Sequence, residues 1–172
     1  YKWYKKISGS GDIDLTSITE SSKGIVVSVN YVKDITIDGN TISNAGYQDS
    51  VLIALSTNGT YQWNKTIGGV GTEEISKVIT DNEDNIIAVG GFGSELKFGA
   101  NTITPTKPDD EEMGDANAIM LKFSSTNGEY ISNYTFGSKY RDQKLTSAVA
   151  SADGGVILSG WYYNNNIDFD GD

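Results

Sequence analysis

The stretch Tyr61-Gln-Trp-Asn-Lys-Thr-Ile67-Gly68-Gly69 decides the fold, because the chain contains it in three versions. Tyr1-Lys-Trp-Tyr-Lys-Lys-Ile7-Ser8-Gly9 is an earlier copy, and Tyr130-Ile-Ser-Asn-Tyr-Thr-Phe136-Gly137-Ser138 is a later one. Sixty residues separate Trp3 from Trp63, and sixty-nine separate Ile67 from Phe136. A long period in a chain of short strands indicates stacked structural copies, each of which buries a hydrophobic face against its neighbour.

Four strand signals recur along the chain. They are short, rich in β-branched residues and bounded by Gly, Asn or Asp, which favours buried strands over helices. The first signal is at residues 15–19, 75–80 and 145–150, the second at 25–31, 86–92 and 156–162, and the third at 51–55 and 118–123. The repeated aromatic stretch is the fourth. We therefore expect four antiparallel strands per unit.

Turn residues separate these signals. Asn58-Gly59 and Asn127-Gly128 lie between the third and fourth signals, where a pair of residues with positive φ closes a tight hairpin. A satellite hairpin is expected at residues 35–42 and again at 96–103. The second copy also carries an insertion at residues 104–114, which contains both prolines and four consecutive acids. That composition is typical of a solvated loop.

Four antiparallel strands per unit, stacked radially, are the plan of a β-propeller blade. We expect one all-β domain over residues 1–172, with repeats at about 1–60, 61–129 and 130–172. These would make about two full blades plus partial ones, hence an incomplete ring. A start at Tyr1 without Met and an end in mid-repeat at Asp172 favour a fragment of a longer protein over one protomer of a multi-chain ring. A β-solenoid and a plain β-sandwich are alternatives, although a sandwich does not explain such long self-similarity.

The middle repeat also carries a family pattern. It reads Ile67-Gly68-Gly69, then Glu73 and Glu74, then Asn-Ile-Ile-Ala-Val-Gly-Gly-Phe over residues 85–92, then Phe98-Gly99. This pattern resembles the SBBP-type β-propeller repeats of bacteria. The outer repeats depart from it at three serines, which stand where the pattern has Gly, Trp and Gly: Ser8, Ser132 and Ser138. The resemblance implies a propeller fold, a bacterial origin and an extracellular or cell-surface location.

Composition narrows the classes of function. The chain has no Cys and no His, which excludes Ser-His-Asp and Cys-His catalysis within it, because a nucleophile needs a base within hydrogen-bond reach. The net charge of −10 argues against nucleic acid and anionic membranes, whose binding depends on clustered Lys and Arg. No apolar run reaches the length of a membrane span. We therefore expect no enzyme activity and no membrane insertion.

The end of the sequence contains a candidate calcium site. Asp168, Asp170 and Asp172 alternate along the chain, so that several carboxylate oxygens can turn toward one hard cation, and Gly171 permits the sharp bend. The alternative is an ordinary β-turn, because this stretch aligns with the first half of the satellite hairpin. Calcium is the one cofactor that the sequence suggests.

An acidic run is the first candidate for partner binding. Asp109, Asp110, Glu111 and Glu112 lie in the inserted loop, and loops on repeat scaffolds often carry binding function. The alternative is a solvated loop whose adjacent carboxylates repel one another.

An aromatic cluster is the second candidate. Trp161 and Tyr163 precede three Asn residues, and aromatic faces beside amides suit a sugar-binding surface. The alternative is core packing, since Tyr162 aligns with Phe92 and Tyr31. Trp3 and Trp63 also recur at one position, as expected if they pack between units.

These features predict a non-catalytic, extracellular or cell-surface binding or adhesion scaffold, which displays loops to a protein or glycan partner. One alternative is a structural spacer or self-assembling propeller element. Another is an accessory domain of a secreted polysaccharide-degrading enzyme. Self-association is also expected, because an open run of blades leaves sheet faces uncovered at both ends.

Overall fold

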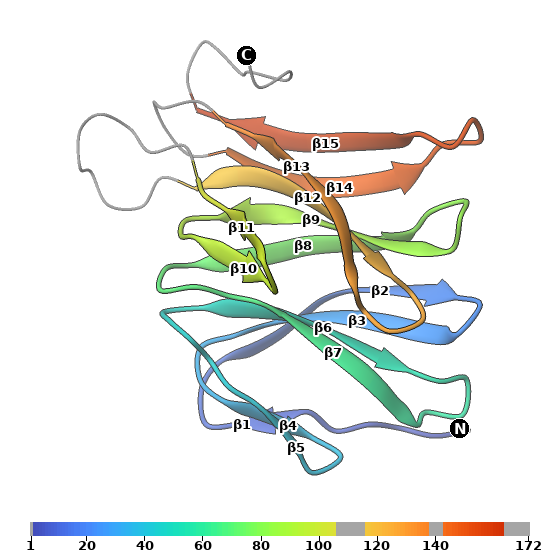
Figure 1. The fold of residues 1–172 in the computed structure, drawn as a ribbon. Coiled ribbons are helices and arrows are strands. Elements are labelled where there is room, and N and C mark those ends of the chain that lie inside the picture. The colour runs from blue at the N-terminus through green and yellow to red at the C-terminus, as the bar shows by residue number, and fades with distance from the viewer. Residues whose placement is uncertain (1, 106–115, 138–142, 164–172) are drawn as a thin grey trace.

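The computed structural model describes residues 2–105, 116–137 and 143–163. Over these residues the protein is all-β and its sheets are antiparallel, as predicted. Three main sheets lie one above another (Figure 1). The described strands form an open stack and do not close into a barrel or a ring.

Two of the three sheets have four strands in chain order. The first sheet consists of β2 (Ile13–Ser21), β3 (Gly24–Tyr31), β6 (Asp49–Leu55) and β7 (Tyr61–Ile67). The second consists of β8 (Glu73–Thr80), β9 (Asn85–Phe92), β12 (Asn117–Ser124) and β13 (Tyr130–Phe136). The third contains β14 (Gln143–Ala150) and β15 (Val156–Tyr162). Each strand signal in the sequence therefore corresponds to a strand, with the exception of the leading aromatic copy.

The first strands of the three sheets are equivalent in register as well as in order. Each pairs with the following strand and has one irregularity at the same place, between Leu15 and Ser17 in β2, Ile75 and Lys77 in β8, and Leu145 and Ser147 in β14. A β-bulge increases the local twist of a strand and redirects its side chains. The shared position shows that the three sheets repeat one local structure.

Satellite hairpins connect the second and third strands of both full sheets, as predicted. They are β4 (Ile35–Ile37) with β5 (Asn40–Ile42), and β10 (Leu96–Phe98) with β11 (Asn101–Ile103). Their apolar residues point into the cores, with Ile35 and Leu96 both fully buried.

The leading copy of the aromatic stretch is not a strand, contrary to expectation. Residues 2–7 have no regular structure, and only β1 (Ser8–Gly9) pairs, with β4. In the full sheets this stretch pairs with a third strand, and no third strand lies beside residues 2–7 in the described part of the chain. The same sequence pattern forms a strand only where a neighbouring strand accepts its backbone hydrogen bonds.

The Asn-Gly turns also differ from expectation in one respect. Only the glycine has positive φ, 82° at Gly59 and 68° at Gly128, so the two residues are not a positive-φ pair. The amide of Gly59 donates to the carbonyl of Ser56 at 2.8 Å, which makes this a longer hairpin loop. Such a loop needs a single left-handed residue at its end.

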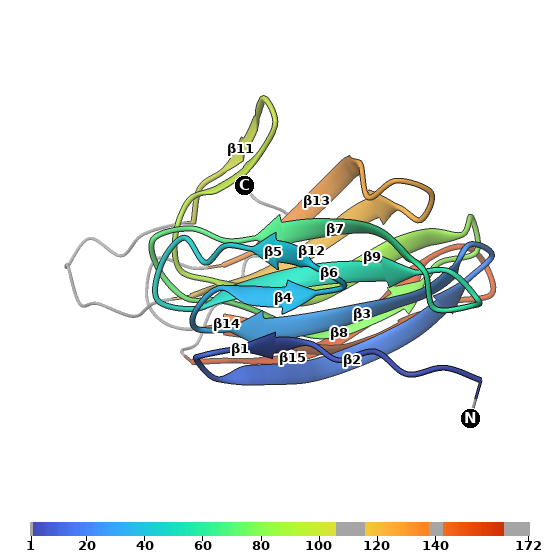
Figure 2. The ribbon, with the colours of Figure 1, turned by 90° about the horizontal axis from the view of Figure 1, so that it is seen from below.

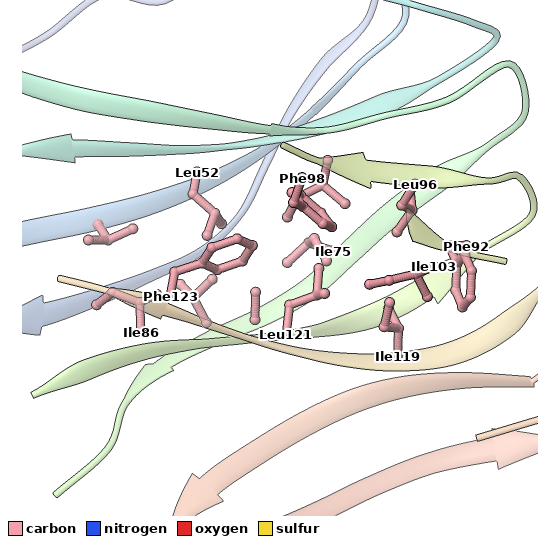
Figure 3. Close-up of a cluster of buried hydrophobic side chains, with 14 of the residues drawn as sticks. Leu52, Ile75, Ile86, Phe92, Leu96, Phe98, Ile103, Ile119, Leu121 and Phe123 are labelled. Carbon is pink, nitrogen blue, oxygen red and sulfur yellow. The ribbon is translucent and has the colours of Figure 1, made fainter. Parts of the chain in front are cut away.

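The largest core lies between the first and second sheets (Figure 3). It joins Leu52 of β6 to Ile75 and Ile86 of the second sheet, and the satellite residue Phe98 stacks on Tyr130 with ring centroids 5.3 Å apart. Because sheets cover β9 on both faces, seven of its eight residues are buried.

Trp3 and Trp63 have equivalent surroundings. Each indole contacts the hairpin between the third and fourth strands of the following sheet, and each donates its N–H to a backbone carbonyl there at 3.0 Å. A Cβ atom added to Gly59 would lie 2.7 Å from the Trp3 ring, and one added to Gly128 would lie 2.7 Å from the Trp63 ring. The prediction that the recurring tryptophans pack between units is therefore confirmed.

The first strands meet across the boundary between sheets. The Thr16 hydroxyl donates to the carbonyl of Ile75 at 2.7 Å, and the hydroxyls of Thr19 and Thr80 lie 3.1 Å apart. Contacts between β8 and β14 continue this arrangement. Seen from below, β2 and β8 lie along one side of the molecule, and β7 and β13 lie along the other (Figure 2).

Candidate interaction surface and a buried carboxyl pair

The third sheet has an uncovered apolar surface, which we call the open face: Val149, Ile157, Trp161 and Tyr163. Val149 and Ile157 are direct cross-strand partners, and Trp161 follows on the same side of β15 because side chains alternate along a strand. Ile157 is 61% exposed, whereas Ile87, its equivalent in β9, is 2% exposed. The difference arises because the third sheet covers Ile87.

The open face brings together two residues that the sequence singled out for binding. The rings of Trp161 and Tyr163 meet edge to face, with centroids 5.6 Å apart and planes at 75°. Both rings are exposed. The packing that alignment predicts for Tyr162 is not formed among the described residues, since Tyr162 is exposed whereas Tyr31 and Phe92 are fully buried.

The opposite end of the stack has a second exposed apolar surface. Leu15 and Ile18 of β2 are 58% and 59% exposed, and we call them the lower face. Their equivalents in β8, Ile75 and Val78, are buried against the first sheet. At both ends of the stack, therefore, exposed apolar side chains occupy positions whose equivalents inside the stack are covered by another sheet.

The other predicted site residues all lie outside the described part of the chain. This applies to the acidic run, Asp109, Asp110, Glu111 and Glu112, and to the candidate calcium ligands, Asp168, Asp170 and Asp172. These assignments stay predictions. Within residues 2–105, 116–137 and 143–163, no three acidic side chains are grouped so that they could hold a metal ion. The described residues also contain no helix that could span a membrane.

Two carboxyl groups are buried together where the first sheet meets the second. Asp49 begins β6 and Glu73 begins β8, and both are fully buried. Asp49 Oδ2 accepts from the amide of Ala45 at 2.6 Å. Glu73 Oε1 accepts from the amide of Ser94 at 3.1 Å and from its hydroxyl at 2.7 Å. The amide of Gly69 contacts both carboxyl groups, so they converge on one point of the backbone.

The environment of this pair favours the protonated acids. Burial raises the pKa of Glu73 and that of Asp49, and the nearby Asp49 raises the pKa of Glu73 further. Among the described residues neither carboxyl group forms an ion pair, and Asp49 Oδ1 and Glu73 Oε2 have no hydrogen-bond partner. A buried charge without a cation is costly, so this junction becomes less stable when the acids ionise.

The next junction uses amides at the same two positions. Asn117 begins β12 and Gln143 begins β14, and the Asn117 Nδ2 donates to Gln143 Oε1 at 3.3 Å. At both junctions the backbone N–H of the first-strand residue also donates to the carbonyl of the residue just before the third strand. Glu73 donates to Gln48 at 2.9 Å, and Gln143 donates to Ala116 at 2.8 Å. The second junction is thus an uncharged counterpart of the first.

The repeated glycine after the fourth strand makes room for these polar side chains. A Cβ atom on Gly68 would lie 2.6 Å from the carboxyl carbon of Asp49, and one on Gly137 would lie 2.3 Å from the amide nitrogen of Asn117. The glycines are apparent in the sequence but the buried pair is not, because the two partners are distant in sequence. The available signal was the alignment of Asp49 with Asn117 and of Glu73 with Gln143.

Comparison of the chain with protein-family models and with curated proteins found no match. The two exposed faces and the buried carboxyl pair are therefore the observations that bear on function.

Proposed function

We propose that this chain is a non-catalytic scaffold of the β-propeller type, whose two uncovered end faces bind further protein. The observation that carries the proposal is the contrast between equivalent residues at the ends and inside the stack. Ile157 and Leu15 are mostly exposed, whereas Ile87 and Ile75 are buried by a neighbouring sheet. Contiguous exposed apolar side chains of this kind mark interaction sites.

The propeller part of the proposal is supported by the arrangement of the strands. Blades of a propeller are four-stranded antiparallel sheets set around a central axis. Here the first strands of successive sheets are in contact, and the fourth strands lie on the far side of the molecule (Figure 2). The resemblance to SBBP-type repeats supports placing the scaffold at the surface of a bacterium or outside the cell.

Assembly with other sheets accounts for the open face better than display of the inserted loop does. Two residues of the open face, Val149 and Ile157, occupy positions whose equivalents in the second sheet, Ile79 and Ile87, pack against the third sheet. The contact of Trp161 with Tyr163 supports a second candidate, binding of a glycan by an exposed aromatic pair. The two candidates predict different effects of substitutions on the same face.

The test is the association state of the protein over a range of concentrations, followed by light scattering. We expect the native chain to associate through its end faces and Ile157→Lys to prevent it. Ile131→Lys is the matched control, because Ile131 is also exposed but lies on β13, away from both end faces. A chain that stays monomeric at all concentrations, or that associates equally well with Ile157→Lys, would contradict the proposal. Glycan binding lost in Trp161→Ala but kept in Ile157→Lys would favour the second candidate.

A further inference from the structure

Three connecting segments lie together where the first sheet meets the second, and we call them the rim: residues 45–48 before β6, residues 68–72 between β7 and β8, and residues 93–94 after β9. Short backbone contacts join them. The N–H groups of Tyr47 and Gln48 donate to the carbonyl of Gly71 at 3.1 and 3.2 Å. The N–H of Gly93 donates to the carbonyl of Thr72 at 3.1 Å. Segments held by so few bonds open more easily than the strands that they connect.

The buried carboxyl pair, Asp49 and Glu73, binds all three segments of the rim. The N–H of Ala45 donates to Asp49, and the N–H and hydroxyl of Ser94 donate to Glu73. The N–H of Gly69 contacts both acids. A change in the pair therefore acts on the rim before it acts on the rest of the two sheets.

The rim packs closely over the pair. A Cβ atom on Gly69 would overlap the Ser94 hydroxyl, and one on Gly46 would overlap the carbonyl oxygen of Gly69. Asp49 and Glu73 are fully buried, and each has one oxygen without a hydrogen-bond partner among the described residues. A carboxylate needs water or a cation when it ionises. Water reaches these two oxygens only when the segments of the rim separate.

None of the lysines in the described residues compensates for a negative charge on the pair. The strands β6 and β9 contain no Lys or Arg. Lys65 of β7 and Lys77 of β8 form no ion pair with either acid. The acids that follow the pair and Ser94 in sequence have lysine partners of their own: Glu74 with Lys144, and Glu95 with Lys97.

The other titratable groups near the pair are a tyrosine and an acid. Tyr31 of β3 lies opposite Asp49, and its hydroxyl donates to the carbonyl of Ser43 at 3.0 Å. Burial and then Asp49 raise the pKa of Tyr31, so Tyr31 stays neutral while carboxyl groups titrate. Asp34 also acts on Tyr31, and it is exposed. Neither group favours the ionised form of the pair.

We propose that the junction between the first and second sheets is a proton-dependent latch. Protonated Asp49 and Glu73 keep the rim closed, and their ionisation opens the rim while the sheets stay folded. The equivalent junction has Asn117 and Gln143 in place of the two acids, so it stays closed at either pH. This device goes beyond the proposed function, because it lies inside the stack and does not involve the end faces.

The direction of the response follows from the raised pKa values of the two acids. Closing the rim favours the protonated acids, so its stability is complete at low pH and is lost as the pH rises through the native pKa values. An acidic environment therefore closes the latch, and a neutral or alkaline one opens it.

The experiment is amide exchange of the full chain, followed residue by residue by NMR at pH 4 and pH 8 in the presence of EDTA. Protection is corrected for the intrinsic effect of pH on exchange. The probes are the N–H groups of Tyr47, Gln48 and Gly93, which donate to backbone carbonyls and not to the acids, so they report opening of the rim. The internal control is the N–H of Gln143, which donates to Ala116 at the equivalent junction.

We expect the protection of the rim probes to fall by at least about fivefold from pH 4 to pH 8, while that of Gln143 stays constant. In the double variant Asp49→Asn with Glu73→Gln, which carries the side chains of the equivalent junction, rim protection should not depend on pH. Asp34→Asn is the matched control, because it removes a nearby acid outside the pair and should keep the native response.

Three results would overturn the proposal. The first is rim protection in the native chain that does not change with pH, a result that needs no variant to fold. The second is an equal loss at Gln143, since the whole protein and not the rim would then be opening. The third is protection restored at pH 8 by calcium in place of EDTA, which would assign the pair to a cation instead of protons.

Discussion

Replacement of Glu73 by Gln should stabilise the protein at neutral pH. Glu73 is fully buried, one of its oxygens accepts from Ser94, and the other has no partner among the described residues. Gln keeps an oxygen for Ser94 and places an N–H donor near the second carboxyl group, Asp49. A hydrogen bond across the junction then becomes possible, as between Asn117 and Gln143, but with the donor on the first strand instead of the third.

The sign of the pH dependence follows from the raised pKa of Glu73. A native pKa above the ordinary value of 4.5 means that the folded protein holds a proton that the unfolded chain releases more readily. The stability contributed by this proton is complete below pH 4.5 and is lost as the pH rises through the native pKa. The advantage of Gln over Glu at position 73 should therefore be small at pH 4 and larger at pH 7.

The expected magnitude comes from the cost of the unpaired group. Leaving a buried polar atom without a partner costs about 1–3 kcal/mol. We expect Glu73→Gln to raise the free energy of unfolding by a similar amount at pH 7. For a chain of this size, each kcal/mol corresponds to about 2–4 °C in the melting temperature.

The assay is urea unfolding at a series of pH values from 4 to 8, followed by tryptophan fluorescence. Gln143→Glu is the reciprocal control, because it installs a carboxyl group at the equivalent junction. This variant should lose stability relative to the native chain as the pH rises. If Glu73→Gln is destabilised at pH 7, or if its stability relative to the native chain does not change with pH, ionisation of the buried pair does not weaken this junction.

Two further predictions concern the contacts between sheets. Trp63→Ala should lower the free energy of unfolding by about 3–5 kcal/mol, because Trp63 is buried in the core of the first two sheets, and Trp3→Ala should cost less, because Trp3 is only partly buried. If urea titrations give the same loss in the free energy of unfolding for the two variants, this prediction is wrong. Asp84→Asn should destabilise the protein at neutral pH. The Asp84 carboxylate accepts from the backbone N–H and hydroxyl of Ser22 and from the hydroxyl of Ser125, and these bonds hold its pKa below the ordinary value of 3.8. The stability that the carboxylate contributes is present above pH 3.8 and is lost as the pH falls through the lower native pKa, so an effect of Asp84→Asn that stays constant down to pH 2 would contradict this prediction.

Strand positions were predictable from the sequence because each strand buries a local apolar run. The runs at residues 25–31 and 86–92 correspond closely to β3 and β9, which are covered on both faces. Residues 2–7 show the limit of this signal. They repeat the pattern of β7 but form no strand, because strand formation depends on a partner strand that the local sequence does not specify.

The candidate site was predictable only in part, for the same reason. Trp161 and Tyr163 could be chosen from their composition, and the structure shows that their rings are in contact. Asp49 and Glu73 could not be paired from sequence, because their proximity depends on how the two sheets stack. The exposure of Ile157 could not be predicted from the sequence either, because the aligned residue Ile87 is buried.

One sheet is repeated along the chain, and the copies stack with their first strands in contact. A cysteine pair, Thr19→Cys with Thr80→Cys, probes this stacking, because the two hydroxyls lie 3.1 Å apart on different sheets and the native chain has no Cys. We predict that the two thiols form an intramolecular disulfide under mild oxidation, without loss of the folded state. Two thiols that stay free, or that link only between molecules, would contradict the stacking of β2 on β8.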